Sequence, residues 1–326
     1  MNPKKIAILG PIPRDTIITY MGEEILNYGC ITHPAVALAR LGDPGIEVIP
    51  VAHVRQADEG PIKERLRSFG RMNMDFISSE EDRGDIIQLR YINQNQRQEK
   101  QLGLMNPILP EDVSDLLDCA AFVFLPISDY EISLDTLQYL KASSEGQIIF
   151  DAHGPTNGVA INGQRFHKFW VDMHIWLPFI DVLKMNLEES KCCLVQPEYE
   201  LSELESEKKL DTEHLDELGE YCLNLGLKAL VITVDADGCV VFTKNAEGGV
   251  HKEIVPSIRM EHVIDTTGCG DTFAGGLAYG LLKYPEQYAR AAQYANALAA
   301  MRTQGRTFDV FPPLADIDQM IQNWYP

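Results

Sequence analysis

The sequence predicts an α/β protein built on a mainly parallel sheet, with a second, smaller sheet beside it. Short runs rich in Val, Ile and Leu alternate along the chain with longer amphipathic stretches, which is the pattern of strands joined by covering helices. Several of these runs are apolar at nearly every position, as expected of strands that are covered on both faces. Hydrophobic residues make up 45% of the 326 residues, which is typical of a globular chain that buries a core.

We expect strands of the main sheet at residues 6–9, 47–51, 121–125, 147–151, 181–185, 229–234 and 239–243. We expect helices at residues 34–41, 61–69, 133–142, 212–225, 271–282 and 286–302. Because strand and helix alternate, this order favours parallel strands with helices on the two faces.

Two stretches break the alternation of strands and helices. Residues 15–20 and 85–92 have the length of strands but mix apolar with polar side chains, and residues 93–100 are strongly polar. Such strands suit a small sheet that is solvated on one face. We therefore expect one domain over residues 1–326, with lid segments at about 12–28 and 84–104. The charge-dense stretch 198–209 is expected to be a surface insertion.

Charge and cysteine content exclude several classes of partner. The 28 Lys and Arg against 48 Asp and Glu leave a net charge of −20, whereas nucleic-acid binding needs a basic face, so we expect no nucleic-acid partner. No run of apolar residues is long enough to span a membrane. Seven cysteines without a C-x-x-C suggest neither a disulfide framework nor a zinc site. Since no signal peptide is recognisable before residues 6–9, we expect a cytoplasmic protein.

The most informative stretch is DTTGCGDTFAGG at residues 265–276. Its glycines cluster where a loop turns into the helix expected from Asp271, and such a junction presents unpaired backbone N–H groups that can hold a phosphate. The carboxylate of Asp271 at this site could accept a proton from an attacking hydroxyl. A lone Gly-x-Gly would more simply be a tight turn followed by a helix cap. The full string, with two acids and its glycines at fixed spacing, is much more specific.

This string resembles the second signature of the ribokinase-like (PfkB) family of sugar and nucleoside kinases, D-T-x-G-A-G-D-x-F-x-G-G. Only Cys269, where alanine is usual, departs from it. The resemblance implies a three-layer sandwich with a β-sheet lid, ATP as phosphoryl donor and Asp271 as catalytic base. The other roles that it implies are an anion hole at Gly268, Cys269 and Gly270, and a monovalent-cation (K⁺) site beside Asp265 and Thr267.

Three further segments match the family in the expected order. Asn186 and Glu189 resemble its N-x-x-E motif, which implies that they orient Mg²⁺ through water, although alone they would be a helix cap and a first-turn acid. Thr233 and Gly238 resemble the ends of the nucleotide loop T-x-G-x-x-G, in which Asp235 replaces the first glycine. Asn296 lies in a small-residue stretch that resembles the helix bordering adenine, or is plain helix packing.

The N-terminal half departs more from the family. Asp15 follows the first strand where the family places a substrate-binding aspartate, and Gly29 survives from the first signature, G-G-x-x-x-N-x-A. Tyr28 replaces the other glycine and His33 replaces the asparagine. We therefore assign Asp15, Gly29 and His33 to the acceptor site and expect ribose and fructose to be poor substrates. The alternative for His33 is a structural histidine.

The resemblance leads us to expect an ATP- and Mg²⁺-dependent kinase that phosphorylates a hydroxyl of a small sugar or polyol. Two alternatives stay open: a nucleoside or vitamin-type kinase on the same scaffold, and a catalytically inactive binding or regulatory homologue. The intact loop at Asp271 argues against the inactive homologue, whereas Asp235 and the altered first signature keep it open. Because a lid of this composition leaves an apolar face uncovered, we also expect a homodimer in which two lids pair.

Overall fold

The computed structural model of the chain describes residues 2–19, 21–92, 97–194 and 214–326. Within them, the largest element is a sheet of nine strands in the order β15-β14-β13-β12-β9-β8-β1-β4-β5. The strands from β13 to β5 run parallel, and β14 and β15 add antiparallel strands at one edge. Their bounds are β1 (Lys4–Leu9), β4 (Ile46–His53), β5 (Ile77–Ser78), β8 (Ala121–Phe124), β9 (Gln147–Asp151), β12 (Val182–Asn186), β13 (Ala229–Thr233), β14 (Cys239–Lys244) and β15 (Val250–Val255).

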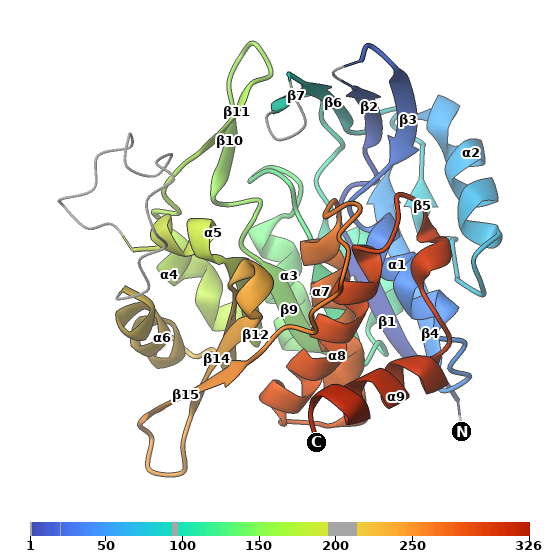
Figure 1. Cartoon of the computed structure of the whole chain (residues 1–326). Coiled ribbons are helices and arrows are strands. Elements are labelled where there is room, and N and C mark those ends of the chain that lie inside the picture. Colours follow the sequence, from blue (N-terminus) through green and yellow to red (C-terminus); the bar gives the residue numbers. More distant parts are fainter. Residues whose placement is uncertain (1, 20, 93–96, 195–213) are drawn as a thin grey trace.

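Helices cover both faces of this sheet and make three layers (Figure 1). One face carries α1 (Thr32–Arg40), α2 (Gln56–Arg67), α7 (Cys269–Lys283), α8 (Tyr288–Arg302) and α9 (Leu314–Trp324). The other face carries α3 (Leu134–Ser143), α4 (Met173–Trp176), α5 (Leu187–Lys191) and α6 (His214–Asn224). Short 3-10 helices are η1 (Pro110–Leu116), η2 (Leu177–Phe179), η4 (Asp235–Asp237) and η5 (Phe308–Val310).

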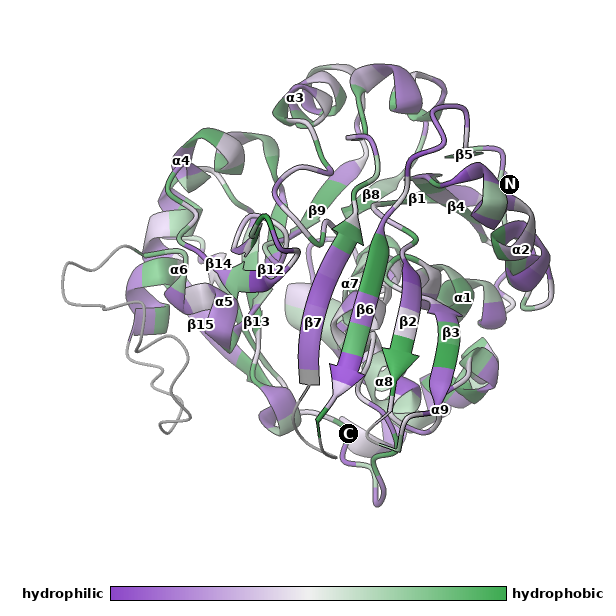
Figure 2. Cartoon of the chain, turned by 90° about the horizontal axis from the view of Figure 1, so that it is seen from above, coloured by the Kyte–Doolittle hydropathy of each residue, from purple (hydrophilic) through white to green (hydrophobic). Residues whose placement is uncertain are grey.

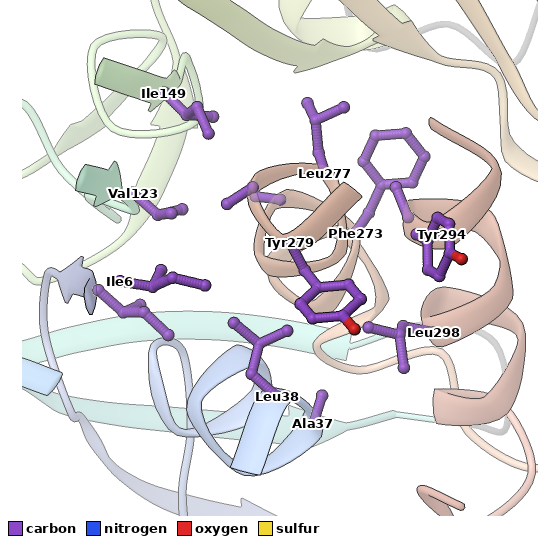
Figure 3. Close-up of a cluster of buried hydrophobic side chains, with 14 of the residues drawn as sticks. Ile6, Ala37, Leu38, Val123, Ile149, Phe273, Leu277, Tyr279, Tyr294 and Leu298 are labelled. Atoms are coloured by element: carbon purple, nitrogen blue, oxygen red, sulfur yellow. The ribbon is translucent and has the colours of Figure 1, made fainter. Parts of the chain in front are cut away.

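The core on the first face forms where α7 and α8 pack against the sheet and against α1. Figure 3 shows Phe273 and Leu277 of α7 and Leu298 of α8 in one buried cluster, with Ile6 and Val123 on the sheet. All five side chains are at most 3% exposed. Burial of this apolar surface stabilises the fold and fixes the N-terminus of α7 relative to the carboxyl ends of the parallel strands.

A second sheet of four strands, in the order β3-β2-β6-β7, forms the lid (Figure 2). Its strands are β2 (Arg14–Ile18), β3 (Glu24–Tyr28), β6 (Ile86–Tyr91) and β7 (Arg97–Gly103). Alternate residues face opposite sides: Ile87 and Leu89 are 5% and 6% exposed, whereas Leu26 and Leu102 are 55% and 56% exposed. The lid therefore has an inner face turned toward the protein and an outer face turned toward solvent.

A short antiparallel hairpin, β10 (Asn157–Val159) and β11 (Arg165–His167), contacts the edge of the lid. The backbone N–H of Gln101 in β7 donates to the carbonyl of Gly163 in the hairpin turn at 2.8 Å. This contact ties the loop that follows β9 to the lid and carries Arg165 toward the carboxyl ends of the main strands.

The predicted fold class is confirmed: the chain is a three-layer α/β sandwich with a mainly parallel central sheet and a small β-sheet lid. One helix begins well before its predicted start. It begins at Gln56, ahead of the expected start at Pro61, because Asp58 and Glu59 supply favourable acids to an earlier first turn. Residues 198–209, the expected surface insertion, lie outside the described part of the chain.

Candidate active site

The site is organised by the N-terminus of α7. Gly268 is its N-cap and has φ +78°, a left-handed conformation that glycine adopts without strain. No side chain among the described residues caps this helix, and its first backbone hydrogen bond runs from the N–H of Thr272 to the carbonyl of Gly268 at 2.9 Å. The N–H groups of Gly270 and Asp271 precede this bond, so they are available to an anion. In contrast, the N–H of Cys269, expected in the anion hole, donates to the carbonyl of Thr266 at 3.2 Å.

A buried ion pair lies against this loop. Lys184 and Asp151 stand directly opposite each other on β12 and β9, and Lys184 Nζ donates to Asp151 Oδ2 at 2.7 Å. A Cβ built on Gly270 would lie 3.1 Å from the same Nζ, so the ammonium group touches the anion loop. Burial disfavours the charged amine, but the carboxylates of Asp151 and Glu189 outweigh burial and raise the pKa of Lys184. A permanent positive charge therefore stands beside the amides of α7.

The motif at Asn186 and Glu189 forms a reciprocal helix cap at the start of α5. Asn186 Oδ1 accepts from the N–H of Glu189 at 2.7 Å, and Glu189 Oε2 accepts from the N–H of Asn186 at 2.8 Å. The other carboxylate oxygen of Glu189 is 2.8 Å from Nδ1 of His153. Burial alone would raise the pKa of Glu189, but the interaction with His153 outweighs it and lowers this pKa to about 2. Glu189 is therefore an anion at every working pH.

The described residues contain no group of three His, Cys, Asp or Glu side chains that could hold a metal ion by itself. Both oxygens of Glu189 already accept protein hydrogen bonds. Hard oxygen atoms and a fixed negative charge nevertheless suit Mg²⁺ that is bound to nucleotide phosphates and keeps several of its waters. The donor set fits such an ion and does not form a closed cage.

Asp271 occupies the first turn of α7, close to these charges. Burial raises the pKa of the Asp271 carboxyl above its usual range, and the positive charge of Lys184 opposes this shift only in part. A carboxylate with a raised pKa is a better proton acceptor than an ordinary exposed aspartate. Position and electrostatics thus both suit Asp271 to accept a proton.

His33 lies beneath the anion loop and not on an open pocket wall. Its side chain is 1% exposed, and its ring lies where a Cβ on Gly268 would be. The Nε–H of Arg302 donates to Nδ1 of His33 at 3.1 Å, and the ring of Phe308 packs edge-on at 5.2 Å between ring centroids. Burial, with the charge of Arg302, lowers the pKa of His33 to about 3. His33 is a neutral, buried histidine that supports the loop, so the structure does not support its assignment to the acceptor.

The expected nucleotide loop follows β13. Thr233 is the last residue of that strand, and η4 with Gly238 turns the chain into β14. Asp235 has φ +43°, a left-handed conformation that glycine adopts with less strain. Gly238 has φ +104°, and a Cβ there would collide with the backbone of Val255. The turn thus carries an exposed carboxylate at Asp235.

Asn296 of α8 joins this region to the C-terminus. Its Nδ2 donates to the carbonyl of Pro256 at 3.1 Å and lies 3.1 Å from the hydroxyl of Tyr325. The hydroxyl of Tyr325 donates to the same carbonyl at 2.5 Å. The side chain of Asn296 therefore positions the segment that follows β15.

The acceptor residues expected from the N-terminal half converge only in part. Asp15 lies on the inner face of the lid, 7% exposed, and a Cβ on Gly29 would collide with its carboxylate. The hydroxyl of Tyr28 instead donates to Asp58 of α2 at 3.1 Å. Tyr28 thus contacts α2, and His33 lies under the anion loop. The expectation that ribose and fructose are poor substrates stays a prediction.

Further polar side chains on the inner lid face were not identified from the sequence. Gln101 Nε2 donates to Asp85 Oδ1 at 2.6 Å, and this amide is also 3.4 Å from Glu131 Oε1. Gln101 Oε1 and Asn27 Oδ1 are buried and have no hydrogen-bond partner among the described residues. Burial raises the pKa of Glu131 well above its usual range and that of Asp85 to about 6.

Cys30 connects this polar cluster to the loop of Asp271. Its thiol donates to the carbonyl of Leu125 at 3.3 Å, and its φ is +48°. Burial raises the pKa of Cys30, and the negative charges of Asp271 and Glu131 raise it further. Both carboxylates therefore lie within electrostatic reach of the Cys30 thiol.

The sequence analysis also missed four charged or titratable residues of the site, which are Lys184, Asp151, His153 and Arg302. A signal for Lys184 was present, because a lysine in the middle of an apolar run that reads as a strand covered on both faces needs a buried partner. Arg302 gives no such signal, since arginine in the last turn of a helix is ordinary. Its role comes from contacts across 269 residues of sequence, which no local pattern encodes.

Comparison with known proteins shows which kinases this chain is similar to. Residues 147–308 match the family model of the pfkB family carbohydrate kinases. A 5-dehydro-2-deoxygluconokinase of Geobacillus kaustophilus is 28% identical over 142 residues, which is 42% of this chain and 39% of that protein. The chain thus spans about two fifths of the length of this curated relative.

Solved structures extend the fold similarity to nearly the whole chain. The ribokinase of Giardia lamblia superposes with a TM-score of 0.75 at 18% identity, covering 99% of this chain and all of that one. A pyrophosphate-dependent kinase of the ribokinase family, solved with a pyrophosphate analog and myo-inositol, superposes with a TM-score of 0.71 at 17% identity, covering 97% and 99% of the two chains. At these identities the superpositions establish the fold.

The three-layer sandwich, the lid and the uncapped helix N-terminus with its acid define a protein of the ribokinase-like class. The match of residues 147–308 then gives the family: the chain belongs to the pfkB family of carbohydrate kinases, which are phosphotransferases.

Proposed function

We propose that this protein is an ATP-dependent kinase that transfers a phosphoryl group to a hydroxyl of a small sugar or polyol, with Asp271 as the catalytic base. One observation carries the proposal. Asp271 stands in the first turn of α7, where Gly270 lies against the buried ammonium group of Lys184. A base, an anion-binding helix end and a fixed positive charge are the parts that phosphoryl transfer requires.

The reaction follows from these positions. The acceptor hydroxyl gives its proton to a carboxylate oxygen of Asp271 as its oxygen bonds to the terminal phosphorus of the donor. The bond from that phosphorus to the bridging oxygen breaks, and the nucleoside diphosphate leaves with the bonding electrons. The amides of Gly270 and Asp271, with the charge of Lys184, stabilise the phosphoryl oxygens during the transfer. The raised pKa of Asp271 favours proton acceptance.

The donor would lie over the carboxyl ends of β12 and β13. Thr233, Gly238 and Asn296 border this region, and Asn186 and Glu189 are the residues that we propose to hold the water shell of nucleotide-bound Mg²⁺. Mg²⁺ would supply neutralisation of the phosphate charge. The K⁺ expected beside Asp265 and Thr267 would have to share Asp265 with Arg302, which already pairs with it.

The inner face of the lid supports a polyhydroxylated acceptor. The unpaired amide oxygens of Asn27 and Gln101, with the carboxylate of Asp15 on the same face, accept hydrogen bonds. Sugars and polyols supply several hydroxyl donors, and a buried acceptor left unpaired is unfavourable. A nucleoside remains the alternative acceptor, since its ribose also carries hydroxyls.

The direct experiment measures phosphorylation with ATP or pyrophosphate as donor and ribose, fructose, myo-inositol and inosine as acceptors. We expect turnover of at least one polyhydroxylated acceptor with ATP, and its loss in Asp271→Asn. The matched control is Asp135→Asn, which changes an exposed acid in the first turn of α3. ATP binding without turnover of any acceptor would favour an inactive homologue. Turnover with pyrophosphate alone would refute the ATP assignment.

The outer face of the lid supports the expected homodimer. Leu26 and Leu102 lie on it, both more than half exposed, and pairing of two lids would remove them from water. We expect light scattering to give twice the chain mass, and a monomer at micromolar concentration would contradict the dimer.

The seven cysteines are all free thiols, which suits the reducing cytoplasm proposed for this protein. The described residues include no helix that is long and apolar enough to cross a membrane.

A further inference from the structure

Asp265, at the start of the anion loop, already has partners for both carboxylate oxygens. Its Oδ1 accepts from the N–H of Thr267 at 2.9 Å. Its Oδ2 accepts from Nη2 of Arg302 at 3.2 Å. The first contact fixes the turn of the loop, and the second joins the loop to the end of α8.

Arg302 is the most deeply buried cation near the loop, at 1% exposure. Besides Asp265, its Nη1 donates to the carbonyl of Gly305 at 2.5 Å, and its Nε donates to Nδ1 of His33 at 3.1 Å. All three nitrogens of the guanidinium group are therefore used, on three different segments of the chain. Because arginine stays protonated in proteins, this is a permanent positive charge.

These contacts do not fit a monovalent metal ion beside Asp265. Such an ion needs several oxygen ligands, typically carbonyl and carboxylate oxygens that replace its water. The carboxylate of Asp265 and the carbonyl of Gly305 are oxygens of this kind, and both already accept from Arg302. A metal ion placed there would also stand next to a like charge that is barely screened by water. The residues of this chain therefore disagree with a K⁺ site.

We propose that the guanidinium group of Arg302 is the built-in cation of the anion loop, so that activity requires no monovalent metal ion. Arg302 is a positioning residue: it fixes Asp265 and the turn at Thr267, and through them the amides at the N-terminus of α7. This inference rests on the proposed kinase function, whose loop it concerns.

His33 supports the anion loop together with Arg302. The ring contacts Gly268 from below and accepts the Nε–H of Arg302 with Nδ1. An amide side chain is shorter than the imidazole and could not both reach Arg302 and fill the space under Gly268. His33 and Arg302 are thus complementary, since Nδ1 of His33 accepts the Nε–H of Arg302 and the same ring fills the space under Gly268.

The test on the unaltered enzyme compares initial rates in chloride salts of K⁺, Na⁺ and tetraethylammonium at equal ionic strength, with Mg²⁺ constant. We expect the three rates to agree within about twofold. A tenfold or greater activation by K⁺ would overturn the proposal. Thermal unfolding in the same salts is the second readout, and a stabilisation specific to K⁺ would also overturn it. This readout needs no catalysis, so it remains decisive if no acceptor is turned over, which would be a failure of the proposed function alone.

The test by substitution is Arg302→Met, which removes the charge and keeps much of the volume. We expect kcat to fall roughly a hundredfold and to recover partly when K⁺ or guanidinium is added. Arg306→Met, an exposed arginine four residues further on, is the control and should respond to neither. Loss without rescue by any cation would show a merely structural role and contradict the proposal. If Arg302→Met does not fold, Arg302→Lys keeps the charge, and it should fold and need no K⁺.

Discussion

Lys184 and Asp151 face each other on the adjacent parallel strands β12 and β9, joined by a 2.7 Å ion pair in which both side chains are almost fully buried. Two charges in such a place are costly unless they compensate each other. The pair stands at the carboxyl ends of the strands, and its ammonium group touches the anion loop at Gly270. It therefore serves stability and the proposed chemistry together, and these two roles can be separated.

The substitution Lys184→Met is expected to lower the free energy of unfolding by about 3–5 kcal/mol, because it leaves the carboxylate of Asp151 buried without its partner. The double variant Lys184→Met/Asp151→Asn removes both charges and should regain most of this stability. It should not regain turnover, since the phosphoryl group still lacks the ammonium group. Urea unfolding and kcat measure the two effects. Recovery of turnover in the double variant would show that Lys184 acts only through stability.

His33 predicts a pH dependence of stability. Its pKa is about 3 in the folded protein, below the value of about 6.5 in an unfolded chain. Between these values only the unfolded state takes up the proton, so the free energy of unfolding falls as the pH decreases from about 6.5, by at most about 1.4 kcal/mol per pH unit from this residue. In His33→Asn the slope should be shallower, whereas the exposed His251→Asn should keep it. Equal slopes in all three proteins would contradict a buried, neutral His33.

Asp235 combines a left-handed backbone with a carboxylate at the proposed phosphate site. Asp235→Gly should raise the free energy of unfolding by about 1 kcal/mol, because glycine adopts φ +43° without the steric cost of a side chain. ATP should bind more tightly, since a negative charge near the phosphates is removed. Asp237→Gly, in the same turn but without a left-handed φ, is the control and should not be stabilised. Calorimetry measures both quantities, and weaker ATP binding in Asp235→Gly would contradict this placement of the donor.

The raised pKa of Asp271 sets the acid limit of activity. Because the proposed base must be ionised, kcat/KM should decline as the pH falls through this pKa, which burial places above the ordinary value of about 3.9. The decline should therefore begin at a higher pH than for an exposed aspartate. A rate that stays constant down to about pH 4 would show that the ionisation of Asp271 does not limit the reaction.

The main sheet could be predicted from the sequence because its strands are nearly continuous apolar runs, as in β8 and β13. Strands at the edges were missed for the opposite reason. β7 reads RQEKQLG and β15 reads VHKEIV, and these polar segments are strands only because a neighbour supplies the hydrogen bonds. Local propensity cannot report such a neighbour. The helix α9 was missed although Ile317 and Ile321 form a buried stripe, because no capping signal precedes it.

The candidate site divides in the same way. The string around Asp271 could be interpreted because its glycines, its acid and the helix that follows are local features of sequence. The partners of that loop are distant: Arg302 and His33 meet across 269 residues, and Lys184 meets Asp151 across 33. The departures at Tyr28 and His33 were noticed in the sequence, but their packing against α2 and under the anion loop could not be predicted, because a side chain's direction depends on what packs beside it.

The central claim is that Asp271 accepts the proton of the acceptor hydroxyl, and its most direct test is the turnover of Asp271→Asn with the acceptor found active. The asparagine keeps the shape of the first turn of α7 but cannot take the proton. We predict a kcat roughly a hundredfold to ten-thousandfold lower, with a nucleotide dissociation constant within a few-fold of the unaltered protein. The control Asp135→Asn should leave both values unchanged. Near-normal turnover in Asp271→Asn would contradict the account.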